Sequence, residues 1–204
     1  MKTEKNTLKN ILNYTRELSI VVLGIAITLT ATYSLSNQSE KRDMKLYLNA
    51  IKLELEENLK IIEEKQEYFR ITNQFAEFLL SNKSKDKFSE EFKETAGTVS
   101  YMNIKTSAFE MFKSSGTMRL VQNKVLLNSI WESYAELESS ENGNNTYMQK
   151  KWDELFNYML IKRSTALDFD ENDRLYTFLS INIGFDEELD KAADTIKHTL
   201  KLLE

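Results

Sequence analysis

The stretch DFDENDRLYTFL contains the residues whose types and spacing come nearest to a metal site. The side chains at the first, third and fifth positions of a calcium-binding loop are Asp168, Asp170 and Asn172. Such a loop also needs glycine at its sixth position and a bidentate glutamate at its twelfth. The chain has Asp173 and Leu179 there, so we expect no calcium ion and interpret the acids as a solvated turn that caps the next helix.

Other residues that could do chemistry lack the partners that catalysis needs. His198 is the only histidine, and the chain has no cysteine for a thiolate zinc site or a nucleophile. No glycine-rich phosphate loop, serine elbow or HExxH motif is present. Acidic pairs such as those in ELEENLKIIEEK alternate with lysine, which is typical of a solvated helix face. We therefore expect no catalytic residue, no metal, no cofactor and no enzyme activity.

Charge and composition restrict which partners and which fold class we expect. The chain has 27 basic and 32 acidic residues, a net charge of −5, and no concentrated basic run that could neutralise phosphates. We therefore expect no nucleic acid partner. Among 204 residues there is no proline and there are five glycines, so few positions can break a helix. This composition predicts an all-α fold.

The first element predicted along the chain is a helix formed by an apolar run. Between Glu17 and Glu40 lie 22 residues without a charge, which as a helix reach about 33 Å, against roughly 30 Å of bilayer hydrocarbon. A buried helix of a soluble protein is seldom apolar on every face over this length. A signal peptide is another alternative, because Ser34 and Ser36 match a small-residue cleavage pattern, but its apolar core is usually about 7–15 residues long. We expect a retained membrane helix at residues 18–36.

This helix divides the chain into three predicted parts. Residues 1–17 form an amphipathic N-terminal tail, residues 18–36 cross the bilayer, and residues 37–204 form a helical stalk and bundle domain. Four basic residues before the span are matched by four basic residues soon after it, so the positive-inside count is tied. A short basic tail favours a cytoplasmic N-terminus and an extracytoplasmic C-terminal domain, and cytoplasmic placement of that domain is the open alternative.

Small residues recur every fourth position along the span. They are Gly24, Thr28, Thr32 and Ser36. Such a stripe lets a second helix approach closely and offers hydroxyls for hydrogen bonds, which predicts a helix-association face. Two alternatives use the same residues: each threonine hydroxyl bonds the preceding turn of its own helix, or several spans together form a hydroxyl-lined pore.

After the span, neither glycine nor proline occurs until Gly97, so we expect the membrane helix to continue into a long stalk helix. Apolar residues at helical spacing predict the packing face of this stalk: Leu48, Ile51, Leu55, Leu59, Ile62 and Phe69. A second apolar side includes Leu46 and Leu53, and Asn58 and Lys65 interrupt the heptad register. These features predict contact with a second subunit, and hence a homo-oligomer, rather than a plain coiled coil.

A polar connection at residues 81–107 follows the stalk. Ser107 and Glu110 have the spacing of a capping box, which predicts a helix start there. Ser115 and Gly116 predict the end of the same helix a few residues later.

Three helices are predicted in the rest of the chain. The first begins near Asn123 and ends at the turn-rich ENGNN of residues 141–145. The second has an aromatic and methionine stripe that we interpret as core: Met148, Trp152, Leu155, Phe156, Met159 and Leu160. The third begins near Asp186, whose side chain can cap it, and its inward-facing residues are Leu189, Ile196, Leu200 and Leu203. Together these elements predict an antiparallel helical bundle.

Two stretches contain recognisable motifs: RELSIVVLGIAITL at residues 16–29 and AFEMFKSSGTMRLVQNKVLLNSIWESYAEL at residues 108–137. An Arg-Glu pair leads into the span, and a Ser-Ser-Gly break precedes a Leu-Val-x-Asn-Lys helix. The residues that carry these motifs are Arg16, Glu17, Gly24, Ser115, Gly116, Leu120 and Asn123. With them, the chain resembles a family of uncharacterised bacterial single-span membrane proteins with a C-terminal all-helical domain of unknown function. The resemblance implies a single-span anchor in a bacterial inner membrane and no established activity.

These features favour a single-pass membrane protein that acts as an oligomeric binding, sensing or scaffolding module. Its expected partners are the lipid bilayer, further copies of the chain, and an unknown protein or small-molecule ligand. The alternative is a ligand-gated, oligomeric pore-forming effector in stress response or anti-phage defence. The stripe at Gly24, Thr28 and Thr32 fits both functions and does not separate them.

Overall fold

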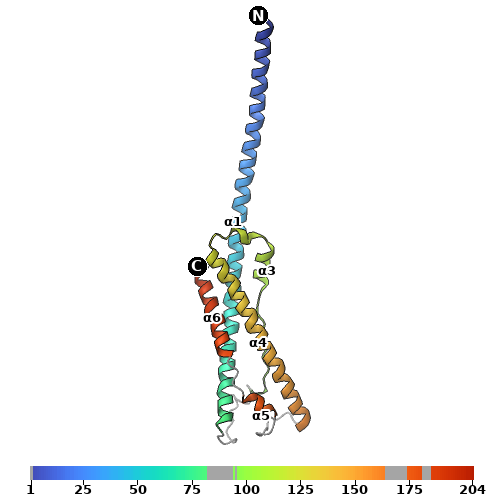
Figure 1. Ribbon diagram of the computed structural model, residues 1–204, viewed down its shortest axis with the longest axis vertical. Helices are drawn as coiled ribbons and strands as arrows, with labels where there is room; N and C mark the ends of the chain where they lie inside the picture. The colour runs from blue at the N-terminus through green and yellow to red at the C-terminus, as the bar shows by residue number, and fades with distance from the viewer. Residues whose placement is uncertain (1, 82–93, 95, 164–173, 181–184) are drawn as a thin grey trace. The chain divides into compact units, whose positions relative to one another are not determined.

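The computed structural model describes residues 2–81, 94, 96–163, 174–180 and 185–204, with side chains from residue 18 onward. Every regular element in these ranges is a helix, so the predicted all-α fold is confirmed (Figure 1). The elements are α1 (Lys2–Leu80), α3 (Ser107–Ser114), the 3₁₀ helix η2 (Thr117–Leu120), α4 (Lys124–Lys162), α5 (Arg174–Leu179) and α6 (Phe185–Leu202).

Helix α1 contributes to two compact units, Met1–Leu46 and Tyr47–Glu204. It runs without a break from the apolar run into the stalk, as predicted from the absence of helix breakers. The unit boundary lies ten residues after the predicted end of the span at residue 36. The two boundaries have different physical causes. Residue 36 ends the apolar run, whereas at Tyr47 α1 packs on other elements of the second unit, since the Tyr47 ring centroid lies 6.4 Å from that of Phe112.

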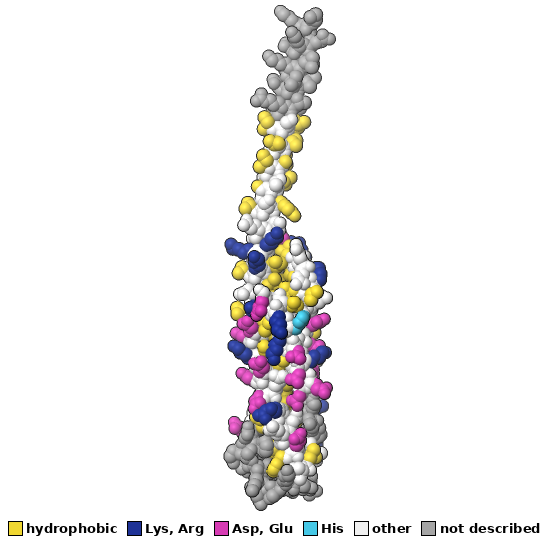
Figure 2. Space-filling view, turned by 90° about the vertical axis from the view of Figure 1, so that its left-hand side faces the viewer, with side chains coloured by type: hydrophobic (Ala, Val, Ile, Leu, Met, Phe, Trp, Pro, Cys, Tyr) yellow, Lys and Arg dark blue, Asp and Glu magenta, His cyan; other side chains and the backbone are white. Residues whose placement is uncertain are grey.

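In the first unit, the apolar side chains of residues 18–36 project from a lone helix, seen as the yellow upper part of Figure 2. Leu18, Leu29 and Leu35 are 57%, 65% and 69% exposed. Among the described residues, this is one helix long and apolar enough to cross a membrane, by length and composition. The backbone of the predicted tail lies in α1, and its side chains are outside the described part of the chain.

In the second unit, the C-terminal half of α1 and helix α4 run in the same direction (Figure 1). Glu54 contacts Tyr134, and Phe69, later in α1, contacts Tyr147, later in α4. The parallel arrangement arises because residues 98–106 return the chain as an extended segment between them. Helices α3 and α6 run antiparallel to α1, because Phe109 and Phe112 of α3 meet Glu54 and Tyr47, and Asp186 and Asp190 of α6 meet Asn73 and Gln66. The predicted antiparallel arrangement therefore applies to these two helices, whereas α1 and α4 are parallel.

Helix α6 packs closely on α4 through small polar residues. Ser133 Oγ and Thr199 Oγ1 lie 2.8 Å apart, and Thr199 Oγ1 donates to the Ser129 carbonyl oxygen at 3.0 Å. These three residues are at most 4% exposed. Short side chains let the two helix backbones approach each other, and the buried hydroxyls satisfy one another.

The predicted start of the last helix near Asp186 agrees with the observed start of α6 at Phe185. Asp186 lies in the first turn, where its Oδ2 accepts a 2.7 Å hydrogen bond from Asn73 Nδ2 of α1. Of the residues predicted to face inward, Leu189 and Ile196 are buried, and Leu200 and Leu203 are half-buried.

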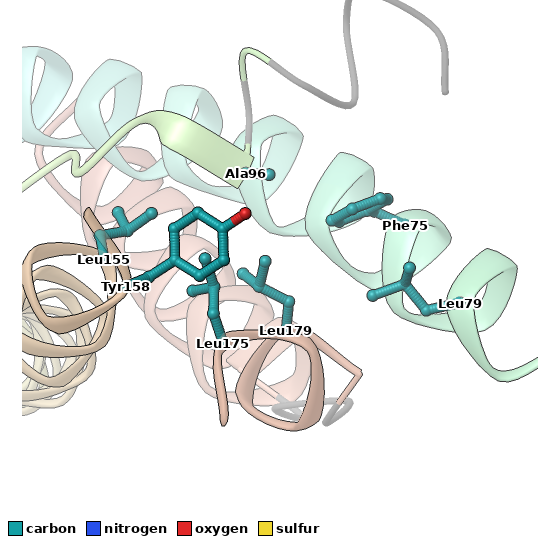
Figure 3. Close-up of a cluster of buried hydrophobic side chains, with 7 residues drawn as sticks. All are labelled: Phe75, Leu79, Ala96, Leu155, Tyr158, Leu175 and Leu179. Carbon is teal, nitrogen blue, oxygen red and sulfur yellow. The ribbon is translucent and has the colours of Figure 1, made fainter. Parts of the chain in front are cut away.

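A hydrophobic cluster forms where α1 ends (Figure 3). Its buried members are Phe75, Leu79, Ala96, Leu155, Tyr158, Leu175 and Leu179. Tyr176 OH of α5 donates to the Leu79 carbonyl oxygen at 2.8 Å. Since each buried large apolar side chain contributes about 1.5–3 kcal/mol, this cluster fixes α5 against α1 and α4.

The predicted helix break at residues 141–145 is wrong. Helix α4 is 39 residues long and continues through ENGNN without a break. Asn144 is fully buried, and the side-chain amide of Asn145 bonds the backbone of Met102 twice, its oxygen accepting from the amide and its nitrogen donating to the carbonyl oxygen. Gly143 packs against Phe185, whose ring would lie only 2.7 Å from an added Cβ. Tertiary contacts thus keep these residues helical, although in isolation they favour a turn.

The interpretation of residues 148–160 as a core stripe is wrong for three of its members. Met148 and Leu155 are buried, but Trp152, Phe156 and Leu160 are 47%, 47% and 60% exposed. The inward position between Met148 and Leu155 is taken by Lys151, which is fully buried. A charged side chain at this position could not be recognised as interior from hydrophobic periodicity.

Candidate functional site

The predicted helix-association residues share one exposed stripe of α1 at four-residue spacing. Thr28 Oγ1 donates to the Gly24 carbonyl oxygen at 2.9 Å, and Thr32 Oγ1 donates to the Thr28 carbonyl oxygen at 2.8 Å. These bonds correspond to one alternative that the sequence left open. These bonds use the hydroxyl protons, but the small side chains of the stripe stay exposed, so a second helix could still approach closely: Gly24, Thr28, Thr32 and Ser36. The association face therefore stays a prediction.

The predicted stalk residues lie along the face of α1 that meets the rest of the second unit. Ile51, Leu55, Ile62 and Phe69 are fully buried, whereas Leu48 and Leu59 are half-buried. The second apolar side is exposed at Leu46 and Leu53, by 60% and 54%.

Asn58 and Lys65, which were expected to imply a second subunit, face inward on this same stripe, at 0% and 7% exposed. Both bind the extended segment of residues 98–106. Asn58 Nδ2 donates to the Lys105 carbonyl oxygen at 2.7 Å, and Asn58 Oδ1 accepts from the Lys105 amide at 2.8 Å. Lys65 Nζ donates to the carbonyl oxygens of Ser100 and Tyr101 at 2.8 and 2.9 Å. Contacts within one chain therefore explain both residues, and neither requires a second subunit.

Helix α4 binds the other side of the extended segment. Asn145 Oδ1 accepts from the Met102 amide at 2.8 Å, and Asn145 Nδ2 donates to the Met102 carbonyl oxygen at 2.9 Å. Glu141 Oε1 accepts from the Ile104 amide at 2.9 Å. Side chains of two helices thus supply the hydrogen bonds that a neighbouring strand would otherwise supply.

Lys151 completes this set of contacts. Its Nζ donates to Tyr68 OH at 2.6 Å and to the Thr98 carbonyl oxygen at 2.7 Å. Burial lowers the pKa of Lys151 to about 7 and, to a smaller extent, lowers the pKa of Lys65. Burial also raises the pKa of Tyr68 to about 12. The extended segment is therefore bound by an ionisable group that changes charge near neutral pH.

Glu54 of α1 fixes the start of α3, where a capping box was predicted. Glu54 Oε2 accepts from the Ala108 amide at 2.8 Å, and Oε1 accepts from the Phe109 amide at 3.2 Å. The observed N-cap, Thr106, makes no side-chain cap hydrogen bond, so the capping-box prediction at Ser107 and Glu110 is wrong. A carboxylate more than fifty residues away supplies the acceptor, a contact that local spacing cannot reveal.

The predicted helix boundaries on either side of η2 agree with the structure. Gly116 follows α3 with a φ of 71°, a left-handed conformation that glycine adopts without steric cost. Asn123 caps α4, because its side-chain oxygen accepts from the amides of Val125 and Leu126. The motif residues Ser115, Gly116, Leu120 and Asn123 thus form the turn between α3 and α4.

A pocket of about 420 Å³ lies between the extended segment, α3 and α4, and we identify it as the candidate ligand site. Its aromatic walls are Phe109, Trp131 and Tyr134. The Phe109 and Tyr134 rings stack at 4.1 Å with an interplanar angle of 4°, and Trp131 meets Phe109 edge-on at 4.9 Å. Tyr134 OH donates to Glu54 Oε1 at 2.6 Å, so the carboxylate that fixes α3 also orients this ring.

Charged groups line the same pocket. Lys113 Nζ lies 5.0 Å from the Phe109 ring centroid and 5.6 Å from that of Trp131. It also donates to Glu110 Oε1 at 2.7 Å. Glu138 and Glu141 contribute two further carboxylates. Burial, reinforced by the Glu54 carboxylate, raises the pKa of Tyr134, so its hydroxyl stays protonated at neutral pH.

Sequence reasoning did not identify this pocket. The helical spacing of Trp131, Tyr134 and Glu138 places them on one face of α4, which was a usable signal. Phe109 and Lys113 line the pocket because Glu54 fixes the position of α3 by accepting from the Phe109 amide. No local sequence pattern predicts that contact. His198 is exposed on α6, and the acidic residues 168–173 lie outside the described residues, so their interpretation as a metal-free turn stays a prediction.

No family model, curated protein or solved structure matches the chain. The resemblance to bacterial single-span membrane proteins therefore stays a prediction.

Proposed function

We propose that this chain is a single-pass membrane protein whose helical unit acts as a binding or sensing module. One observation carries the proposal: the side chains of the apolar run of α1 are exposed, and none of its most apolar window is buried among the described residues. In water, each large apolar side chain left exposed forgoes about 1.5–3 kcal/mol of hydrophobic stabilisation. A bilayer removes this cost, because residues 18–36 then lie in hydrocarbon.

The second unit supplies the binding function in this proposal. Its pocket combines three aromatic side chains with carboxylates and one lysine, a composition suited to recognising a ligand. In the described part of the chain, no group of three His, Cys, Asp or Glu side chains could hold a metal ion. The aromatic walls of the pocket support recognition of an organic ligand as the module's role.

We further propose that copies of the chain associate through the stripe from Gly24 to Ser36. A Cβ added at Gly24 would meet nothing within 4 Å in the described part of the chain, so this part of the helix surface is open to a second helix. The proposed location is a bacterial inner membrane with the second unit outside the cytoplasm. The basic N-terminal tail and the family resemblance support this assignment.

Membrane extraction tests the anchor. Alkaline carbonate should leave the full chain in the pellet, and detergent should release it. The double substitution Val22→Arg and Ile25→Arg should shift the chain to the soluble fraction, because a charge at the bilayer centre costs about 2.5–3.5 kcal/mol. Leu53→Arg is the matched control, since Leu53 is an exposed apolar residue of α1 outside the span. Release of the unmodified chain by carbonate would refute the anchor.

Cysteine labelling determines the orientation, since the chain has no cysteine of its own. Asn128 lies on the exposed face of α4, so Asn128→Cys gives one accessible thiol. A membrane-impermeant maleimide should label it in intact cells if the second unit is extracytoplasmic. Labelling only after cell lysis would establish the cytoplasmic alternative.

The pore-forming alternative has less support in the structure. The hydroxyls of Thr28, Thr30 and Thr32 all donate to carbonyl oxygens of their own helix at 2.8–2.9 Å. Full-length protein in dye-loaded liposomes should cause no leakage beyond that of the Val22→Arg, Ile25→Arg variant. Leakage that depends on the intact span would favour the pore over the binding module.

A further inference from the structure

The pocket between the extended segment, α3 and α4 already contains a cation. Lys113 places its ammonium 5.0 Å from the Phe109 ring centroid and 5.6 Å from that of Trp131. Aromatic ring faces are negative and attract cations within about 6 Å. The Lys113 side chain is 34% exposed and comes from the short helix α3, so solvent or a ligand can reach its charged end.

The rings are held in place before any ligand arrives. Phe109 and Tyr134 are 5% and 4% exposed and stack face to face, and Glu54 bonds both the Phe109 amide and Tyr134 OH. Trp131 stands edge-on to Phe109 and is 43% exposed, which makes it the accessible wall. A preformed aromatic surface lowers the ordering cost of binding.

The charge of the lining selects the sign of the ligand. Three carboxylates line the pocket, from Glu110, Glu138 and Glu141, against the single ammonium of Lys113. Glu110 bonds Lys113, and Glu141 uses one oxygen to accept from the Ile104 amide. The excess of negative charge disfavours anions and leaves Glu138 facing the pocket as a counter-ion for an incoming cation.

The donor set also distinguishes an organic cation from a metal ion. Divalent cations need several converging oxygen ligands. The three carboxylates of the lining do not converge in this way, because among the described residues no group of three His, Cys, Asp or Glu side chains could hold a metal ion. Aromatic faces with a peripheral carboxylate instead suit an alkylammonium group, whose charge is spread over methyl or methylene surface.

We propose that this pocket binds a small organic cation, an amine or quaternary ammonium compound, whose head replaces the Lys113 ammonium on Phe109 and Trp131. Glu138 neutralises the bound charge. The proposal rests on the proposed function, because it treats this pocket as the ligand site of the binding module. It does not depend on the anchor, which the extraction experiment tests separately.

Tryptophan fluorescence offers a direct readout, because the chain has two tryptophans and only Trp131 lines the pocket. In full-length Trp152→Phe protein in detergent, choline should change the emission of Trp131 saturably. The neutral isostere 3,3-dimethylbutan-1-ol should bind at least about fivefold more weakly, since it lacks the cation–π attraction. Equal binding of the isostere, or no saturable response to either choline or hexylamine, would overturn the proposal.

Three variants in this background locate the binding. Lys113→Met should tighten choline binding by about three- to tenfold, because the competing ammonium is gone. Glu138→Gln should weaken binding by a similar factor. Glu132→Gln is the matched control, because Glu132 is exposed on α4 but does not line the pocket, and it should leave the affinity unchanged. Circular dichroism confirms that each variant is folded. If Lys113→Met and Glu138→Gln both bind choline like Glu132→Gln, the site lies elsewhere and the proposal fails.

Discussion

Two stretches of α1 satisfy the polar groups that lie among their apolar side chains in different ways. Between residues 18 and 36, the threonine hydroxyls bond the preceding turn of their own helix. Between residues 47 and 80, Glu54, Asn58 and Lys65 bond the backbone of residues that follow them by at least 35 positions. The first stretch needs no partner from its own chain to satisfy these groups. In the second stretch, each of these side chains bonds one particular backbone group of the second unit, so the polar residues help to determine how that unit folds.

This comparison predicts the largest effect for Glu54→Ala. The substitution leaves three donors without their acceptor: the Ala108 amide, the Phe109 amide and Tyr134 OH. Because each buried unsatisfied group costs about 1–3 kcal/mol, the free energy of unfolding should fall by about 3–5 kcal/mol in chemical denaturation. Glu57→Ala is the control, since Glu57 makes only an exposed ion pair with Lys105 of the extended segment, and stability should barely change. Equal losses in the two variants would contradict the comparison.

Lys151→Met tests whether a buried charge governs the pH dependence of the second unit. Burial holds the folded-state pKa of Lys151 at about 7, below its ordinary value of 10.5. Between these values the unfolded chain binds one more proton, so stability should rise by about 2 kcal/mol from pH 7 to pH 9.

Chemical denaturation at pH 7, 8 and 9 measures this rise, below the range in which tyrosines ionise. Lys151→Met should remove the rise, and Lys150→Met, at an exposed neighbour, should keep it. A wild-type stability that is flat over this range would show that Lys151 is not neutralised by burial.

Two glycines extend the comparison from the stretches of α1 to the two units at the level of a single methyl group: Gly143 of α4 in the second unit and Gly24 of the span. Gly143→Ala places a Cβ 2.7 Å from the Phe185 ring, which itself stacks on Phe69 at 5.1 Å. Overpacking should outweigh the gain in helix propensity, with a net loss of about 1 kcal/mol in thermal or chemical unfolding. Gly24→Ala meets no atom within 4 Å and should not destabilise the second unit. A stabilised Gly143→Ala variant would contradict the close packing of α4 on Phe185.

The smallest effect concerns self-association through the span. Gly24→Ile should weaken the association of full-length chains in lipid nanodiscs or mild detergent, because it blocks close helix approach. The double substitution Thr28→Val and Thr32→Val keeps the shape and removes hydroxyls that already bond within the helix, so it should change association by less than about 0.6 kcal/mol. Energy transfer between labelled copies measures both. Dissociation by the threonine variant would instead assign the contact to hydroxyls between helices.

Local sequence patterns predicted the elements whose causes are local. The continuity of α1 follows from the absence of breakers, and the turn before α4 follows from the conformational freedom of Gly116 and the capping side chain of Asn123. Spacing also identified Ile51, Leu55, Ile62 and Phe69, all fully buried in the structure. In each case the information lies within a few residues of the feature.

The errors occurred where residues distant in sequence supply the partner. ENGNN stays helical because Asn145 bonds Met102 and Gly143 makes room for Phe185. Lys151 is interior because Tyr68 OH and the Thr98 carbonyl oxygen accept hydrogen bonds from its Nζ. The pocket was not predicted for the same reason, since Glu54, which is distant in sequence, determines where Phe109 lies. Propensity and periodicity contain none of these contacts.

The extended segment of residues 98–106 has a consequence for the order of folding. Its hydrogen-bond partners lie 35 positions before it at Lys65 and 53 positions after it at Lys151, and Tyr68 and Lys151 are separated by 83 positions. The segment has its full set of protein hydrogen bonds only when both α1 and α4 are in place, so we expect its docking to be completed late and cooperatively. Helical proteins with local contacts fold fastest, and contacts of this range place the second unit toward slower folding despite its all-α structure.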